Sequence, residues 1–380
     1  MTSTPELAPG LAGVPCAESK IAEIKGDIGK LFYRGYSIED LAEHTTFEET
    51  SYLLLYGELP TAAQLAEFDG KLRAHRRIKY KIVDMLKLLP EHGHPMNALQ
   101  AGVAAMGMFY PARDVMDATT QEESIIRLIA KIPTLVAAFH RVRHGDEAIA
   151  PRDDLNHAAN FLYMVTGEEP DPVAARTLDV CFVLHAEHSM NASTFAARVV
   201  GSTMADPYTV ISSAVGALSG PLHGGANEEV LVMLDEIGSI EKTDAYIESK
   251  IERKDKIMGL GHRVYKAKDP RATIMQELAV KLFGALGSDL RYDIARRIET
   301  IAFDRLAAKG IYPNVDFYSG ILYSKLNIEP DLFTPIFAVA RVAGWLAHWK
   351  EQMENNRIFR PSQIYVGSEP RAFVAADKRG

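Results

Sequence analysis

The sequence predicts a mostly helical fold, because apolar residues recur at helical spacing over long stretches while strand signals are few. The first stretch forms a stripe that consists of Ile125, Leu128, Ile129, Ile132, Leu135, Val136 and Phe139. We expect Pro133 to kink or divide this helix. A second apolar face at 180–184 leads into His185 and His188. A third runs from 336 to 347, where small residues permit close contact with a neighbouring helix.

Two segments depart from this pattern. Residues 20–24 and 31–36 have strand character and flank Gly26-Asp27, which predicts one short β-hairpin. Residues 227–325 are richer in charge than their flanks, especially over 241–256. Most of these charges are expected on a solvated helix face. The change in composition still indicates a second, more exposed domain inserted between two parts of the first.

The composition is that of a soluble globular protein. Of 380 residues, 47% are hydrophobic and 24% are charged, and 42 basic against 50 acidic side chains give a net charge of −8. This balance argues against nucleic acid as the main partner. Two cysteines are too few for a disulfide framework, so we expect a cytoplasmic location. We expect neither a signal peptide nor a membrane span, since the longest uncharged run, 207–227, is broken by glycine and proline.

The first candidate for chemistry is the pair His185 and His188. On a helix, residues three apart share a face, so both imidazoles could enter one site. A zinc site would more often place two histidines four apart with a glutamate beside the first, and that spacing is absent here. The alternative is one buried, hydrogen-bonded histidine and one exposed histidine.

Two glycine-rich segments also contain histidines. His223 lies among three glycines in 220–227, where a structural turn would explain the glycines but not the histidine. His262 follows Gly259 and Gly261, and Lys266 and Arg271 follow it. This second segment suits an anionic ligand but matches neither a Walker loop nor a dinucleotide fingerprint.

Three further charged residues stand out. Asp316 lies among apolar and aromatic neighbours, which predicts a raised pKa suited to a general base; the alternative is an Asx turn or a helix N-cap. Arg341 lies on an otherwise apolar helix face, so its partner should be a protein carboxylate or an anionic ligand. Arg360 precedes Pro361 and could simply be solvated.

Together these segments resemble the citrate synthase family. The resemblance rests on Gly-Pro-Leu-His-Gly at 220–224, Gly-x-Gly-His at 259–262, Asp-Pro-Arg at 269–271 and Asn-Val-Asp at 314–316. It extends over about 24–365 and includes the segments 33–36 and 53–60. It implies an almost all-α fold with a large domain formed by residues 1–225 and 328–380. A small domain, 226–327, would close over the active site.

The resemblance also implies an acyltransferase that condenses acetyl-CoA with oxaloacetate and water to give citrate and CoA. Asp316 would remove the methyl proton, His223 would hydrogen-bond the thioester oxygen, and His262 would protonate the oxaloacetate carbonyl. The implied substrate ligands are His188, Arg271, Arg341 and Arg360, the last reaching into the partner subunit of a homodimer. The implied coenzyme contacts are Gly259, Leu260, Gly261, Lys266 and Lys309. No metal and no tightly bound cofactor are expected.

Three alternatives remain open at this stage. 2-Methylcitrate synthase, which uses propionyl-CoA, shares every motif above. A metal-dependent hydrolase could be built on the histidine pair, and a helical scaffold without activity would not need His223, His262 and Asp316 at all.

Overall fold

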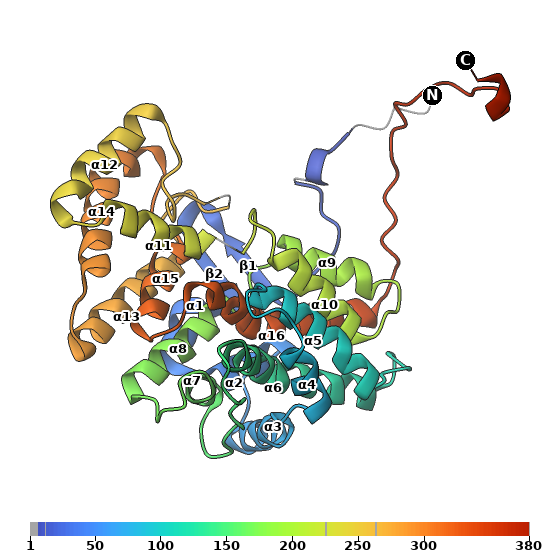
Figure 1. Ribbon diagram of the computed structural model, residues 1–380, viewed down its shortest axis with the longest axis horizontal. Coiled ribbons are helices and arrows are strands. Elements are labelled where there is room, and N and C mark those ends of the chain that lie inside the picture. Colours follow the sequence, from blue (N-terminus) through green and yellow to red (C-terminus); the bar gives the residue numbers. More distant parts are fainter. Residues whose placement is uncertain (1–6, 12, 225, 263, 380) are drawn as a thin grey trace.

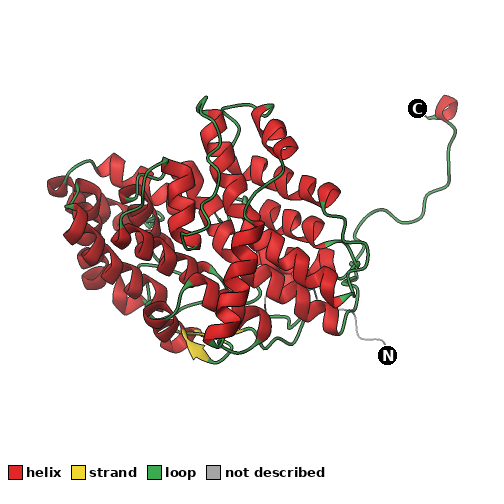
Figure 2. Ribbon diagram, turned by 90° about the horizontal axis from the view of Figure 1, so that it is seen from below, coloured by secondary structure: helices red, strands yellow, loops and turns green. Residues whose placement is uncertain are grey.

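The computed structural model describes residues 7–11, 13–224, 226–262 and 264–379, and helices dominate it (Figures 1 and 2). The chain begins with one small sheet, which consists of β1 (Ala22–Lys25), β2 (Lys30–Tyr33) and β3 (Tyr36–Ser37). The first group of helices comprises α1 (Ile38–His44), α2 (Phe47–Tyr56), α3 (Ala62–His75), α4 (Tyr80–Lys87), α5 (Pro95–Phe109), α6 (Ala118–Arg143), α7 (His157–Thr166), α8 (Pro172–His185), α9 (Ala192–Gly201) and α10 (Pro207–Leu218). The second group comprises α11 (Ala226–Ile237), α12 (Ile240–Arg253), α13 (Pro270–Leu286), α14 (Leu290–Leu306) and α15 (Val315–Lys325), and α16 (Phe333–Glu354) closes the fold.

The predicted hairpin is confirmed, and its turn contributes to the site. β1 and β2 are antiparallel, with Ile24 opposite Leu31. The second strand ends earlier than expected, at Tyr33, and β3 adds a short third strand that was not predicted. The turn packs closely on a loop far away in sequence, because a Cβ on Gly26 would lie 2.4 Å from the Val264 carbonyl oxygen. The hairpin therefore fixes the segment that follows His262.

The long apolar stripes form the centre of the first group. α6 runs without interruption through Pro133, so the expected division of this helix is wrong. Residues 124–126 and 128–139 are buried, and their packing offsets the backbone hydrogen bond that proline cannot make. α16 is buried over most of its length and packs against α2, α6, α8, α9 and α10. The prediction of a late, closely packed helix is confirmed.

The helices α11 to α15 pack mainly on one another and lie to one side of the molecule (Figure 1). α12 contacts α14, and α15 contacts α11 and α13. Among the described residues, α13 makes most of their contacts with the first group, through α8 and α1. No described helix combines the length and the apolar character needed to cross a bilayer.

Five short 3₁₀ turns complete the described structure: η1 (Pro9–Leu11), η2 (Gly26–Ile28), η3 (Ala307–Lys309), η4 (Pro330–Leu332) and η5 (Ala376–Lys378). After α16 the chain extends away from the helical body (Figures 1 and 2). Apolar side chains of this extension are exposed: Ile364, Tyr365, Val366, Phe373 and Val374.

Candidate active site

His188, His262 and Tyr265 meet where the two groups of helices face each other. The rings of His188 and His262 lie 5.6 Å apart, and Tyr265 lies 4.7 Å from His262. His188 Nε2 and the Tyr265 hydroxyl are 3.3 Å apart. His188 follows the end of α8, whereas His262 and Tyr265 belong to the loop before α13. The structure therefore joins two of the predicted site histidines across the two groups.

The His262 ring is held in one tautomer by its own loop. The backbone N–H groups of Val264 and Tyr265 donate to His262 Nδ1 at 3.0 and 3.1 Å. A ring that accepts at Nδ1 carries its hydrogen on Nε2. Burial, together with the nearby Arg271 guanidinium, lowers the pKa of His262 to about 4. His262 is therefore neutral near pH 7 and can present an N–H from Nε2.

His223 lies in the turn after α10 and contacts Ser193 of α9. The Ser193 hydroxyl is 2.8 Å from His223 Nε2, and the Ser193 backbone N–H donates to the same nitrogen at 3.3 Å. Trp345 Nε1 donates to this hydroxyl at 3.1 Å, and Asn191 Oδ1 is a second acceptor for it at 2.8 Å. Burial, followed by the charge of Arg341, lowers the pKa of His223 to about 4. His223 is thus a neutral ring held by Ser193 of α9, whose hydroxyl is in turn held by Trp345 of α16.

Asp316 lies in the first turn of α15, but it is not the helix cap. Asn314 is the N-cap, and its side chain accepts a hydrogen bond from the Asp316 backbone N–H at 3.0 Å. The alternative interpretation of Asp316 as an Asx-turn or N-cap residue is therefore wrong, because the cap lies two residues earlier. Asn314 also donates to the Gly261 carbonyl at 2.8 Å, and its backbone N–H donates to the Gly259 carbonyl at 2.9 Å. These bonds connect the acid to the loop that carries His262.

The glycine at 259 is required by this close approach. Its φ of +77° favours glycine, and an added Cβ would lie 2.8–2.9 Å from atoms of Phe317. Asp316 thereby lies in apolar surroundings beside a tightly packed loop. Burial, followed by the repulsion of Asp269, raises its pKa from 3.8 to about 6, although Arg271 and Arg341 oppose the change. The prediction of a raised pKa at this acid is confirmed.

The two histidines predicted as a pair, His185 and His188, have different surroundings. His185 is buried, and its Nδ1 donates to the Cys181 carbonyl at 2.8 Å, so it belongs to the core of α8. His188 is only partly buried, contacts the site, and has a pKa well below 6.5 because of burial and the nearby Arg271 and Arg341. Within the described residues, the two do not belong to a group with metal-ligand spacing.

The two buried arginines have protein partners of different kinds. Arg271 Nε and Nη2 donate to the two carboxylate oxygens of Asp269 at 3.1 and 2.7 Å. Arg341 Nε donates to the His185 carbonyl at 2.6 Å, and the guanidinium lies 4.6 Å from the Phe337 ring centre. Among the described residues the hydrogen-bonded partner of Arg341 is thus a backbone carbonyl and not a carboxylate, the first of the two expected partners. Burial lowers the pKa of Arg341 to about 10, and it remains charged near pH 7.

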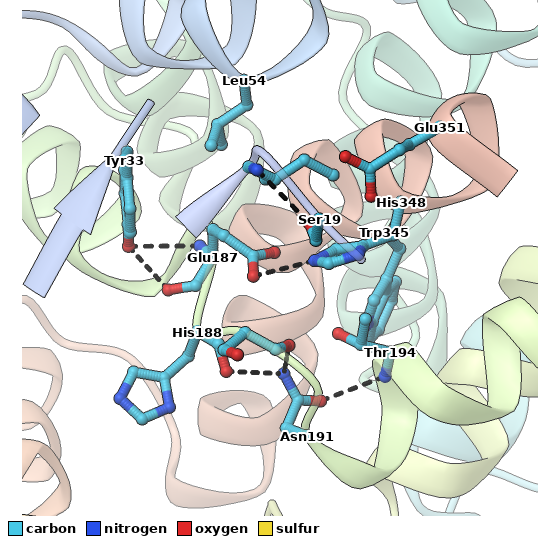
Figure 3. A network of polar contacts seen from close by, with 12 residues as sticks. Ser19, Tyr33, Leu54, Glu187, His188, Asn191, Thr194, Trp345, His348 and Glu351 are labelled. Atoms are coloured by element: carbon cyan, nitrogen blue, oxygen red, sulfur yellow. Dashed lines mark hydrogen bonds and ion pairs between the residues drawn. The ribbon is translucent and has the colours of Figure 1, made fainter. Parts of the chain in front are cut away.

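A buried polar network supports the segment that carries His188 (Figure 3). The Tyr33 hydroxyl donates to the Glu187 carbonyl at 2.7 Å, and His348 Nε2 lies 3.0 Å from Glu187 Oε1. Arg198 Nε donates to His348 Nδ1 at 3.1 Å, which places the His348 hydrogen on Nε2. Glu187 is fully buried, and its charge favours the charged form of the nearby Arg341. The network therefore joins the site to α9 and α16.

The remaining predicted residues lie at the surface. Lys266 is exposed and pairs with Asp27 at 2.9 Å. Lys309 ends η3 and is exposed, and the adjacent Gly310 would place a Cβ 3.1 Å from the Lys266 carbonyl oxygen. Arg360 is exposed and lines a cavity of about 760 Å³ formed by 11–20, α9 and 351–361. None of these three side chains is hydrogen-bonded to the central histidines and arginines in the described structure.

Of two cavities near the junction of the helix groups, only the smaller adjoins the cluster of histidines and arginines. One of about 380 Å³ is lined by Ser219, Pro221 and Met258, which adjoin the His223 turn and the Gly259 loop. A larger one, about 800 Å³, lies between α1, α8 and α13 and is lined by none of the predicted site residues. The volume of a cavity therefore does not identify the site, whereas the cluster of histidines and arginines does.

Sequence reasoning missed several residues that shape this site. Asn314 had a local signal, since an asparagine directly before the first residue of a helix is a typical cap. Ser193, Tyr265 and Glu187 had none, because their contacts join segments far apart in sequence.

Comparison with known proteins gives one consistent result. A family model described as "Citrate synthase, C-terminal domain" matches residues 10–362. A protein named citrate synthase from Synechocystis sp. (strain ATCC 27184 / PCC 6803 / Kazusa) is 56% identical over 379 residues, covering 100% of this chain and 96% of that relative. Another from Acidithiobacillus ferridurans is 50% identical over 382 residues, covering 99% of each.

Solved structures agree. The crystal structure of citrate synthase from Pyrobaculum aerophilum has a TM-score of 0.93 at 42% identity and covers 98% of this chain and 95% of that one. A ternary complex of carboxymethyl coenzyme A and oxaloacetate with citrate synthase from Thermoplasma acidophilum has a TM-score of 0.92 at 32% identity, covering 99% and 100%.

Proposed function

The chain belongs to the citrate synthase family, and from this premise we propose which of its residues carries out each step of the reaction. It condenses acetyl-CoA with oxaloacetate and water to give citrate and CoA. One observation carries the proposed roles. A carboxylate with a raised pKa and two neutral histidines lie within the field of two buried arginines.

In our proposal, Asp316 takes a proton from the acetyl methyl group. Its pKa of about 6 leaves it ionised near pH 7 yet closer to the operating pH than an ordinary carboxylate. His223 donates a hydrogen bond to the thioester oxygen as the enol forms, an interaction worth roughly 3–4 kcal/mol for one well-placed donor. Ser193 positions this ring, because its hydroxyl and its backbone N–H both face Nε2 and leave Nδ1 to carry the hydrogen.

The second half of the reaction uses the other histidine. The enol carbon attacks the carbonyl carbon of oxaloacetate, and His262 gives its Nε2 hydrogen to the carbonyl oxygen as the new bond forms. Water then cleaves the citryl thioester; a proton from this water restores His262, and the proton held by Asp316 passes to the leaving CoA thiolate. The substrate carboxylates bind the guanidinium nitrogens of Arg271 and Arg341 that make no hydrogen bond among the described residues, with His188 beside them. These side chains supply the charge, so we expect no metal and no resident cofactor.

We propose that the coenzyme binds along the loop that ends at His262. The backbone of Gly259, Leu260 and Gly261 would contact the adenine, and Lys266 and Lys309 would meet the phosphates. Two facts support this location: the cavity at Met258 adjoins the loop, and both lysines are exposed on neighbouring segments. The Thermoplasma relative was solved with a CoA analogue and oxaloacetate, which supports a CoA-type substrate here.

We further propose that residues 226–327 move as a small domain against 1–225 and 328–380. The packing of α11 to α15 mainly on one another supports this division. His262, Arg271 and Asp316 belong to the first of these parts, whereas His188, His223 and Arg341 belong to the second. Oxaloacetate bound to arginines of both would therefore favour closure and complete the acetyl-CoA site.

The proposed assembly is a homodimer in which Arg360 enters the partner's site. Its support is that Arg360 is exposed in this chain, on an extension whose apolar side chains are also exposed. A second copy would cover that apolar surface in an isologous contact. The two free thiols, Cys16 and Cys181, are compatible with the cytoplasmic location that we propose.

The assembly can be tested by subunit exchange. An Arg360→Ala chain mixed with an Asp316→Asn chain should recover activity, because one site of each mixed dimer then has both defects and the other has neither. Mixed dimers that form without recovering activity would show that Arg360 acts within its own chain or not at all.

The function itself is tested by release of free CoA. We expect release from acetyl-CoA with oxaloacetate, and a lower kcat/KM with propionyl-CoA. The relatives named citrate synthase favour this outcome over the 2-methylcitrate alternative. A preference for propionyl-CoA would reverse the substrate assignment, and no release from either thioester would overturn the proposed activity.

A further inference from the structure

A second cluster of histidines lies outside the site already described. His140 and His144 are four residues apart at the end of α6, and Glu329 lies in the connection between α15 and α16. One ring nitrogen from each histidine and one carboxylate oxygen lie within 4.8 Å of one another. Within the described ranges this is the one group of three such side chains at metal-ligand spacing.

The tautomer of His144 decides whether its Nε2 is a donor or an acceptor toward Glu329. His144 Nδ1 lies 2.7 Å from the His140 carbonyl oxygen, which can only accept, so Nδ1 carries the ring hydrogen. In the neutral ring, Nε2 is then a bare lone pair. It faces Glu329 Oε1 at 3.3 Å, and a carboxylate oxygen is also an acceptor. Two acceptors face each other at this distance favourably only when the ring is protonated or a metal cation lies between them.

His140 contributes a second nitrogen that lacks a partner. Its Nδ1 is buried without a hydrogen bond and lies 3.9 Å from Glu329 Oε2. Buried polar atoms of this kind are uncommon and costly. The two rings meet edge to face with centres 4.9 Å apart, so both can approach one point in front of the carboxylate.

The spacing fits a small divalent metal ion. Zinc bonds of about 2.0–2.2 Å in a tetrahedron place neighbouring ligand atoms about 3.3–3.6 Å apart. The pair formed by His144 Nε2 and Glu329 Oε1 already has this separation, at 3.3 Å. The ligand atoms of the three residues lie within 4.8 Å of one another, so shifts of about 1 Å bring all of them to this spacing, and the Glu329 side chain is 46% exposed and free to adjust.

We propose that His140, His144 and Glu329 bind one divalent first-row transition-metal ion. Two imidazoles and one carboxylate suit Zn²⁺, Co²⁺, Ni²⁺ or Cu²⁺, whereas Mg²⁺ and Ca²⁺ require oxygen ligands. The bond from His144 Nδ1 to a backbone carbonyl is the outer contact that metal-binding histidines usually make.

Arg143 orients the carboxylate and also limits the affinity. Its guanidinium donates to Glu329 Oε2 at 2.6 Å and to Asp331 Oδ1 at 2.8 Å. The first bond leaves Glu329 Oε1 turned toward His144. Because Arg143 already balances part of the negative charge, we expect a micromolar rather than a nanomolar site.

A bound ion would connect α6 to the chain segment that leads from α15 to α16. α15 carries Asp316, so this link restrains the connection through which the proposed small domain joins the rest of the molecule. This consequence rests on the proposed function, whereas metal binding itself does not.

The test is a calorimetric titration of the full, untagged chain with Zn²⁺ near neutral pH, after chelator treatment and dialysis. We expect one ion per chain. Glu329→Gln and His144→Gln should each weaken binding by at least about tenfold, since even outer-shell changes cost about 10–100-fold. Asp331→Asn is the matched control, because it alters the partners of Arg143 and removes no ligand. His92→Gln, at an exposed histidine elsewhere, should leave binding unchanged.

Two further measurements keep the proposal open to refutation. Zn²⁺ should raise the melting temperature of the wild type but not of His144→Gln, and bound Cu²⁺ should show coupling to two imidazole nitrogens, reduced to one in that variant. Binding that survives unchanged in both ligand variants would place the ion elsewhere. If the wild type binds no Zn²⁺, a proton alone holds His144 against Glu329 and the proposal is wrong.

Discussion

Replacing Asp316 with asparagine should stabilise the protein and inactivate it at the same time. Burial raises the pKa of this carboxyl from 3.8 to about 6, which means that the folded chain disfavours its charge. A difference of about two pH units corresponds to ~3 kcal/mol. Asp316 is only partly buried, and contact with water reduces the effect, so we expect ~1–3 kcal/mol. The amide keeps the shape and removes the charge.

The sign of the effect follows from the two pKa values. Below pH 3.8 the carboxyl is neutral in the folded and the unfolded chain, and the substitution should change little. Above pH 6 it is charged in both, so the full cost is present in the wild type and absent in the variant. The stabilisation should therefore develop between these values. Activity should follow the same group, with kcat/KM of the wild type rising through about pH 6.

Calorimetric melting and steady-state kinetics measure the two effects. An unfolding entropy of about 2.1 cal/mol/K per residue over 380 residues gives ~0.8 kcal/mol/K, so the melting temperature above pH 6 should rise by about 1–4 °C. The kcat should fall roughly 10²–10⁴-fold, as expected when a general base is lost. Asp304→Asn, at an exposed acid on α14, is the control and should change neither. A variant that melts at or below the wild-type temperature above pH 6, or that retains near-normal kcat, would refute this reasoning.

Three further changes test the supports of the site. Ser193→Ala should lower kcat about 10–100-fold with little change in the KM for oxaloacetate. The substitution frees the His223 ring and leaves the buried Trp345 N–H without its partner. An unchanged kcat would show that Ser193 does not position His223. Gly259→Ala should lower both the melting temperature and kcat, since a Cβ would lie 2.8 Å from the first turn of α15. The control Gly284→Ala has open space around its Cβ and should be neutral or stabilising. Equal behaviour of the two variants would contradict the close approach at Gly259. Oxaloacetate should tighten binding of a non-reactive acetyl-CoA analogue in calorimetry, and equal affinity with and without it would argue against closure.

Much of the site could be anticipated from short segments. The motifs around His223, His262 and Asp316 each contain their glycines, histidine or acid within a few residues, and resemblance to a family supplied their roles. Sequence could not say what each group contacts. Arg271 has a carboxylate partner two residues away in Asp269, yet nothing in the sequence distinguished this pairing from a free guanidinium.

Local patterns in the sequence were enough to predict the central helices, whereas the contacts between polar groups depend on how those helices pack. The stripe of α6 and the small residues of α16 are local patterns, because helical periodicity is set by neighbours three and four residues apart. Ser193 contacts His223 at 30 residues' separation, and Glu187 contacts His348 at 161. Such pairs form only after helices have packed, and the orientation of a buried ring then depends on donors that several separate segments bring to it.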